Sequence, residues 1–199
     1  MEFQVVSKMP APRANQVAAL IDLPGRALFD GAAARKHPGW KDLARRRREE
    51  ELGSEYLALG EAALLYLPAA AAKYWDDDEK IRILAARALE VAAARNAGQL
   101  VVVLDGPAGA AAAPLAAEGI ALQAYRFVQY KPSAVRKDPA VTLVCPAADL
   151  AAATAAVARA AARAAATNRA RDLINEPGSV ATPAEIERRA REVAKAAGL

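Results

Sequence analysis

The sequence is poor in the residues that most often build catalytic centres. Its 199 residues include one histidine, His37, and one cysteine, Cys145. A zinc site with histidine ligands, a Ser-His-Asp triad or a Cys-His pair would each have to use His37, which has no partner at a characteristic spacing. We therefore expect His37 to be a surface residue in a polar stretch and Cys145 to be a buried, unreactive thiol.

The single cysteine also excludes a disulfide within the chain and fits a reducing compartment. The N-terminal stretch MEFQVVSKMP lacks the charged-then-apolar pattern of a signal peptide. A membrane helix needs about 20 consecutive apolar residues. The Ala-rich segment 147–167 does not provide them, because Asp149, Arg159 and Arg163 interrupt it. The sequence predicts a cytoplasmic protein without membrane contact.

Aromatic residues make up only 5% of the chain, whereas 54% of the residues are hydrophobic and 25% are charged. This balance is typical of a globular protein. Much of the apolar share is alanine, which adds little buried area per residue. The core must therefore rest on comparatively few Leu, Ile, Val, Tyr and Phe side chains.

The hydrophobic pattern predicts alternating strands and helices, and hence the α/β class. Continuous apolar runs bounded by turn residues are typical of strands buried on both faces of a parallel sheet. The predicted strands are FQVVS (3–7), EAALLYLP (61–68), QLVVVLDG (99–106) and AVTLVCP (140–146). The predicted helices cover residues 39–52, 76–97, 114–130 and 147–175. The segment between residues 8 and 38 is assigned no element.

Acidic residues precede the second predicted helix. Asp76, Asp77 and Asp78 fit an N-cap followed by acidic groups at the positive end of the helix dipole. Three carboxylates could also hold a hard cation, but the helix start explains them without a metal. Gly98 fits a stop at the end of this helix. The turn LDGPAG (104–109) follows a strand, yet it lacks the glycine spacing and the lysine of nucleotide-binding loops.

Arginines form the candidate surface for nucleic acid. The net charge of +4 permits such a role without implying it. The arginines in question are Arg45–Arg48, Arg159, Arg163, Arg169 and Arg171. Arg45, Arg46 and Arg47 lie four residues before Glu49, Glu50 and Glu51, a spacing at which side chains meet on a helix. A solvated helix face is therefore favoured over a phosphate-contacting patch.

Two stretches of the C-terminal half carry recognisable motifs. EGIALQAYRFVQYK (118–131) has the pattern EG-x-x-L-x-x-Y-x-F-x-x-YK, and NRARDLINEPGSVATPAEIERRAREVAKAAGL (168–199) contains R-D-L-x-N-x-P and T-P-x-x-[IF]. In this order they resemble the M17 leucyl aminopeptidases (cytosol aminopeptidases), with the second stretch in the place of the interdomain segment. The first 75 residues match that family weakly.

The resemblance implies a division of the chain. It implies a macro-domain-like, three-layer α/β domain at residues 1–146, a linker helix at 147–177, and the first helix of a catalytic domain at 178–199. Members of the family hydrolyse N-terminal residues from peptides with two divalent metals, zinc or manganese. The resemblance further implies the chain's own catalytic domain as a partner and a homohexameric parent enzyme.

Catalytic residues of the family lie in motifs of the type VGKG-x-x-FD-x-GG and NTDAEGRL, and neither motif occurs in these 199 residues. We therefore assign no catalytic, cofactor-binding or metal-binding residue to this chain, and we expect it to be inactive alone. Asp172, Asn175 and Glu176 match family positions in the linker, and we interpret them as structural.

The last 30 residues predict a helix end, a hinge and a new helix. Pro177 ends the long helix, because the residue before a proline is pushed out of the α region. Thr182, Pro183 and Glu185 predict a capping box with proline in the first helical position. An apolar stripe comes next on the new helix, formed by Ile186, Ala190, Val193 and Ala197.

Two other functions remain open from the sequence. The first is a DNA-binding or other regulatory binding module built on the arginines. The second is a macro-domain-like binder of ADP-ribose, which the weak phosphate turn at residues 104–109 disfavours. A positioning domain of an aminopeptidase is the favoured interpretation.

Overall fold

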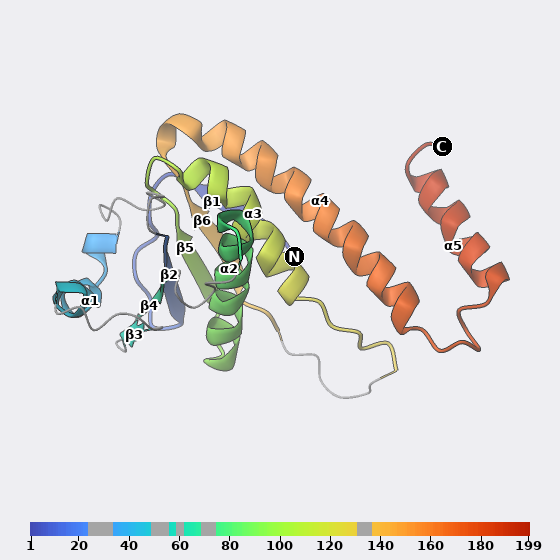
Figure 1. Ribbon diagram of the computed structural model, residues 1–199, viewed down its shortest axis with the longest axis horizontal. Helices are drawn as coiled ribbons and strands as arrows, with labels where there is room; N and C mark the ends of the chain where they lie inside the picture. The colour runs from blue at the N-terminus through green and yellow to red at the C-terminus, as the bar shows by residue number, and fades with distance from the viewer. Residues whose placement is uncertain (24–33, 49–55, 59–61, 69–74, 131–136) are drawn as a thin grey trace.

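The computed structural model describes residues 1–23, 34–48, 56–58, 62–68, 75–130 and 137–199 (Figure 1). A six-stranded sheet has the order β1-β6-β5-β2-β4-β3. Its strands are β1 (Phe3–Val6), β2 (Gln16–Asp22), β3 (Tyr56–Ala58), β4 (Ala63–Pro68), β5 (Gln99–Val103) and β6 (Ala140–Val144). Five of them are parallel, and only β3 at one edge runs antiparallel to its neighbour. The predicted α/β class with a parallel sheet is confirmed.

Helices cover both faces of this sheet. The helices are α1 (Trp40–Arg48), α2 (Asp77–Ala94), α3 (Gly109–Gln123), α4 (Leu150–Asn175) and α5 (Pro183–Ala196), with short 3-10 turns at Ala34–Lys36 and Ala147–Asp149. Side chains of α2, α3 and α4 share one apolar cluster with the sheet. Leu43 and Trp40 of α1 pack on the opposite face. The core therefore has three layers, and α4 continues well beyond it (Figure 1).

The central strand is the element that the sequence analysis missed. β2 pairs with β4 on one side and with β5 on the other, and every residue from Gln16 to Ile21 is buried. With seven residues β2 is no shorter than the strands that were recognised, but two of its residues are alanines, so its apolar signal is weaker. The strand β3 was also missed. The predicted strands at β1, β4, β5 and β6 are confirmed.

Two predicted helix ends were wrong. α2 ends at Ala94, and the residue with left-handed backbone beyond it is Asn96 (φ 53°), not Gly98. Gly98 instead donates its N–H to Asn15 Oδ1 at 2.8 Å and leads into β5. α3 begins at Gly109 and ends at Gln123, whereas the sequence predicted a helix to Tyr130. α1 is described to Arg48, so the predicted pairs with Glu49–Glu51 lie outside the described residues.

The long C-terminal helix is confirmed. α4 covers 26 residues and ends where Glu176 adopts an extended conformation before Pro177. No helix in the described part of the chain is both long and apolar enough to cross a membrane.

Candidate interdomain junction

Glu118 connects three helices on one face of the sheet. Its carboxylate, on α3, accepts a hydrogen bond from Arg82 Nε of α2 at 3.0 Å. Arg163 Nε of α4 lies 3.8 Å from the other carboxylate oxygen. The Arg82–Glu118 pair is partly shielded from water, with 29% and 18% of the side chains exposed, whereas the Arg163 side chain is 59% exposed. The first residue of the EG motif thus fixes α3 between its two neighbours.

The glycine of the same motif allows the helices to approach closely. A Cβ atom at Gly119 would overlap the backbone carbonyl group of Arg82 on α2. Because that obstacle is backbone, no side-chain rearrangement can relieve it. Only glycine permits α2 and α3 to pack at this distance.

Side chains of α4 end α3. In a continuing helix, the carbonyls of Ala121 and Leu122 would accept from residues 125 and 126. Here Asn168 Nδ2 donates to Ala121 O at 3.1 Å, and Arg171 Nη1 donates to Leu122 O at 2.9 Å. These tertiary bonds satisfy the last carbonyls of α3 and let the chain turn along α4. Leu122 O also accepts from the Tyr125 N–H at 3.4 Å, so the carbonyls at this helix end are satisfied without a longer helix.

Tyr125, the first residue of the turn's aromatic motif, contacts the end of α4. The guanidinium carbon of Arg171 lies 4.9 Å from the ring centre, a cation–π distance. Asn175 Nδ2 donates to the Tyr125 hydroxyl at 3.0 Å. Partial burial and the nearby Asp172 carboxylate raise the pKa of Tyr125, so its hydroxyl remains protonated. Asp172 and Asn175 thus both lie against Tyr125, and their structural interpretation stays a prediction.

Tyr130, the second tyrosine of the motif, contacts Glu176. Its hydroxyl donates to one oxygen of the Glu176 carboxylate, and Arg189 Nη2 of α5 donates to the other oxygen at 2.9 Å. Glu176 is buried. The hydrogen bonds from Tyr130 and Arg189 lower the pKa of the Glu176 carboxyl, so it is ionised at neutral pH. Three segments thus meet at one buried charge: the turn after α3, the end of α4, and α5.

α5 begins with half of the predicted capping box. Thr182 Oγ1 accepts from the Glu185 N–H at 3.3 Å. The reciprocal bond was wrongly predicted, because the Thr182 N–H donates to Val180 O and the Glu185 carboxylate accepts from Arg188 and Arg189. These two arginines lower the pKa of the Glu185 carboxyl to about 2. The apolar stripe of the helix is exposed, with Ile186 at 47% and Val193 at 52%.

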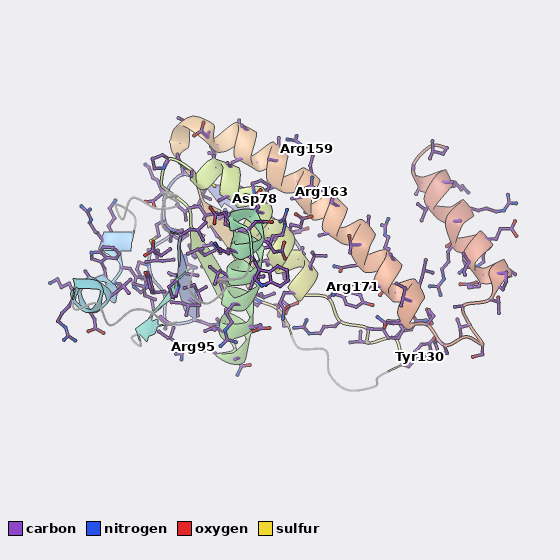
Figure 2. All side chains as sticks on the ribbon, in the orientation of Figure 1. Asp78, Arg95, Tyr130, Arg159, Arg163 and Arg171 are labelled. Carbon is purple, nitrogen blue, oxygen red and sulfur yellow. The ribbon has the colours of Figure 1, made fainter. Side chains whose placement is uncertain are left out.

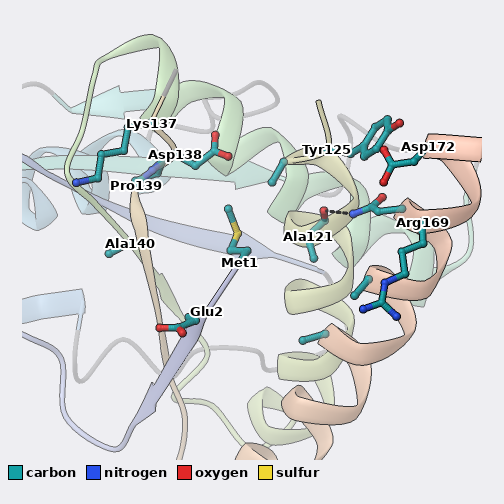
Figure 3. A pocket seen from close by; sticks show the side chains of 14 residues that line it. Met1, Glu2, Ala121, Tyr125, Lys137, Asp138, Pro139, Ala140, Arg169 and Asp172 are labelled. Atoms are coloured by element: carbon teal, nitrogen blue, oxygen red, sulfur yellow. Dashed lines mark hydrogen bonds between the residues drawn. The ribbon is translucent and has the colours of Figure 1, made fainter. Parts of the chain in front are cut away.

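A hollow of about 700 Å³ lies beside this junction (Figure 3). Its walls come from the start of β1, the segment before β6, the end of α3 and the middle of α4. Its charged residues are Glu2, Lys137, Asp138, Arg169 and Asp172. Charged groups of both signs thus line the hollow from two sides, with Lys137 and Asp138 opposite Arg169 and Asp172 (Figure 3).

The structure corrects the prediction for His37. This side chain is buried, and its Nδ1 accepts from the Gly39 N–H at 3.1 Å. His37 O also accepts from the Trp40 N–H at 3.0 Å, so the residue organises the start of α1. Burial lowers the pKa of His37, which keeps the ring neutral. Cys145 is buried as predicted, and burial raises the pKa of its thiol to about 11.

The acidic residues Asp76–Asp78 and the turn 104–109 both form hydrogen bonds or ion pairs with residues close in sequence. Asp76 Oδ1 accepts from the Glu79 N–H at 2.8 Å, which confirms the predicted N-cap of α2. Asp77 pairs with Lys80 at 3.1 Å. No group of three or more metal-ligating side chains occurs within the described ranges. In the turn 104–109, the Gly109 N–H that a phosphate would use donates to Gly106 O at 2.8 Å.

The predicted arginine surface is divided by the structure. Arg163 and Arg171 contact Glu118 and Tyr125. Arg159 and Arg169 are exposed and form no ion pair with any described residue. Figure 2 shows Arg159, Arg163 and Arg171 along α4. Arg45 pairs with Asp42 at 2.9 Å. The side chains of Arg46–Arg48 lie outside the described residues. DNA binding by the exposed arginines stays a prediction.

Sequence reasoning identified the motif positions but not their partners. Arg82, Asn168 and Arg189 were not singled out, although each binds a motif residue or its neighbour. One feature of the sequence could have pointed to Arg189. It lies outside the apolar stripe, and its neighbour Arg188 can form the intrahelical ion pairs of α5 without it. Arg82 and Glu118 are 36 positions apart, and Leu122 and Arg171 are 49 positions apart. Contacts between residues so far apart leave no periodic pattern in the sequence.

The fold and the contacts together define an α/β domain that continues into the long helix α4. No model of a known protein family matches the chain, and no curated protein does. Among solved structures, the bottromycin maturation enzyme BotP in complex with Mn is 26% identical over 93% of this chain, with a TM-score of 0.58. A second BotP structure has a TM-score of 0.59 at the same identity and coverage.

A mutant of tomato leucine aminopeptidase matches 98% of this chain at 14% identity, with a TM-score of 0.72. The chain spans 37%, 38% and 42% of these three structures' own chains. It therefore has the fold of a domain that occurs in a leucine aminopeptidase and in BotP, and it is shorter than either.

Proposed function

We propose that this chain is the non-catalytic N-terminal domain and linker of a two-metal aminopeptidase of the leucyl aminopeptidase class. The observation that carries the proposal is the match to the tomato enzyme, which takes in 98% of this chain but 42% of that one. The motifs at 118–131 and 168–199 support the same conclusion. They resemble M17 enzymes in sequence, and Tyr130 and Glu176 bring them into contact.

The proposed boundaries are the predicted ones. Residues 1–146 form a macro-domain-like α/β domain, 147–177 the linker, and 178–199 the start of the catalytic domain. The role of this portion is to position the catalytic domain and to contribute to the contacts of a homohexamer. The exposed stripe with Ile186 and Val193 supports this role, because such a stripe is suited to packing against a catalytic domain.

Metal chemistry belongs to the rest of the proposed parent enzyme. Two bound metal ions would there activate water and stabilise the tetrahedral intermediate of peptide hydrolysis. The described residues of this chain offer no such cluster of ligands, so no step of hydrolysis is assigned to them.

The activity of the isolated chain tests the proposal. We expect the purified 199-residue protein not to hydrolyse leucine-p-nitroanilide with Mn²⁺ or Zn²⁺ added. A metal-free sample and a heat-denatured sample serve as controls. Metal-dependent hydrolysis by this chain above both controls would overturn the non-catalytic assignment.

DNA binding is the second candidate, and one observation favours it. Arg159 and Arg169 are exposed on α4 without an ion-pair partner in the described part of the chain. Binding through phosphates releases counterions, so the affinity would fall steeply as salt is raised. Gel shifts at low and at physiological salt test this candidate, and the absence of a shift at low salt would dispose of it.

A further inference from the structure

α5 does not pack against the rest of the protein through a buried apolar face. None of its residues is buried. In globular proteins, the orientation of a helix relative to its neighbours is fixed mainly by the burial of its apolar face. That source of order is missing here, since Ile186 and Val193 of the stripe are about half exposed. The direction of α5 must therefore come from polar contacts and from the turn that precedes it.

Arg189 supplies the polar contact. In the part of the chain that the structure describes, it is the only α5 residue whose side chain forms a hydrogen bond outside that helix, to the C-cap residue of α4. Its neighbour Arg188 binds Glu185 at 2.6 Å and Glu192 at 2.5 Å, and both partners belong to α5. Arg189 also binds Glu185, at 2.7 Å, which orients the guanidinium toward Glu176.

The turn between α4 and α5 further restricts the direction of α5. The N–H groups of Val180 and Ala181 both donate to Pro177 O, at 2.8 Å and 2.9 Å. The segment predicted as a hinge is thus closed by its own backbone bonds. Rotation of α5 would separate Arg189 from Glu176 and leave a buried carboxylate with fewer partners, which is costly.

We propose that Tyr130, Glu176 and Arg189 form a linker latch, and that Glu176 is the positioning residue that sets the direction of α5 relative to α4. Tyr130 holds the carboxylate from the side of the α/β domain, and Arg189 binds it from α5. The consequence for catalysis rests on the proposed function: the latch would set the angle at which the catalytic domain leaves the linker.

The direction of α5 can be measured by spin–spin distances in this chain. We place nitroxide labels at the exposed positions Ala166→Cys on α4 and Lys195→Cys on α5. The native Cys145 stays unlabelled, because it is buried and burial raises its pKa to about 11. Distance distributions are compared for the labelled parent, E176Q, R189Q and the matched control R188Q, which removes an arginine whose bonds stay within α5.

We expect a single narrow distribution in the parent and in R188Q. E176Q and R189Q should broaden it by about twofold or more, because the two helices then sample several directions. Since Arg189 lies outside the α/β core, R189Q tests the contact even if E176Q is poorly folded. Circular dichroism checks that α/β content is retained in each variant.

Two results would overturn the latch. One is a distribution in R189Q that superimposes on that of the parent. The other is equal broadening in R188Q, which would assign the effect to the charge of α5 as a whole. Neither result bears on peptidase activity. The hydrolysis assay on the unlabelled chain therefore separates a failed latch from a failed functional proposal.

Discussion

The hydroxyl of Tyr130 donates a hydrogen bond to the buried carboxylate of Glu176, 46 positions further along the chain. The two residues belong to the two stretches whose motifs resemble M17 aminopeptidases. Their contact connects the two motifs, since one supplies the hydrogen-bond donor and the other supplies the acceptor just after the end of α4. Glu118 and Gly119 of the first motif set the helices on which this contact rests.

Replacing Tyr130 by phenylalanine should raise the pKa of Glu176. The tyrosine hydrogen bond is the largest cause of the lowered value, and the variant keeps the ring while removing the donor. Carbon-detected NMR titration of the Glu176 carboxyl measures the change. Tyr125→Phe is the control, because Tyr125 binds Asn175 and not Glu176. An unchanged titration of Glu176 in Tyr130→Phe would show that the hydrogen bond does not form in solution.

The ordering of α5 should depend on pH in the acidic range. A carboxylate with a lowered folded-state pKa stabilises the folded arrangement above its unfolded-state pKa. This stabilisation is lost as the pH falls through the folded-state value. Glu176 and Glu185 both have lowered values, with that of Glu185 at about 2.

The narrow α4–α5 distance distribution should therefore persist from neutral pH to the ordinary range of glutamate and broaden as the pH falls further. In E176Q the distribution should already be broad at neutral pH, with less change on acidification. Broadening in the parent as the pH is raised from about 5 to about 8 would contradict the sign of this linkage.

Gly119→Ala should destabilise the domain by about 1–3 kcal/mol, the usual cost of overpacking. The added methyl group would overlap the backbone of Arg82. Urea unfolding followed by circular dichroism measures the free energy of unfolding. Gly178→Ala is the matched control, because a Cβ atom there meets nothing within 4 Å. That control should be neutral or stabilising by about 0.4–1 kcal/mol. Equal stabilities for the two variants would refute the close approach of α2 and α3.

Arg82→Ala should cost about 1–2 kcal/mol of unfolding free energy, since it removes the charge-assisted bond to the mostly buried Glu118. Arg87→Ala on the same helix should cost less than about 0.5 kcal/mol, because the Arg87–Glu90 pair is exposed. Chemical denaturation of both variants gives the comparison. A loss for Arg87→Ala as large as that for Arg82→Ala would contradict the bridging role of Glu118.

The sequence predicted most of the fold, and its errors have physical causes. β5 and β6 were recognisable because parallel strands buried on both faces are continuous apolar runs. The end of α4 was recognisable because Pro177 forbids its continuation. β2 was missed because two of its residues are alanines, which weakens the apolar signal of the run. Its strand character comes from pairing with β4 and β5, which the local sequence does not encode.

The junction could be predicted only in part for the same reason. The capping residue Thr182 is predictable from local chemistry, whereas the end of α3 depends on Asn168 and Arg171 from a distant helix. His37 was placed on the surface because its neighbours are polar. Its burial depends on the packing of α1 on the sheet, which is a tertiary property.

The central claim is that this chain positions a catalytic domain and does not itself hydrolyse peptides. The most direct measurement is leucine-p-nitroanilide hydrolysis by the 199-residue protein with and without Mn²⁺, with an intact leucyl aminopeptidase as the positive control. We predict metal-dependent hydrolysis by the control enzyme and none by this chain. Metal-dependent hydrolysis by the folded 199-residue chain would contradict the claim.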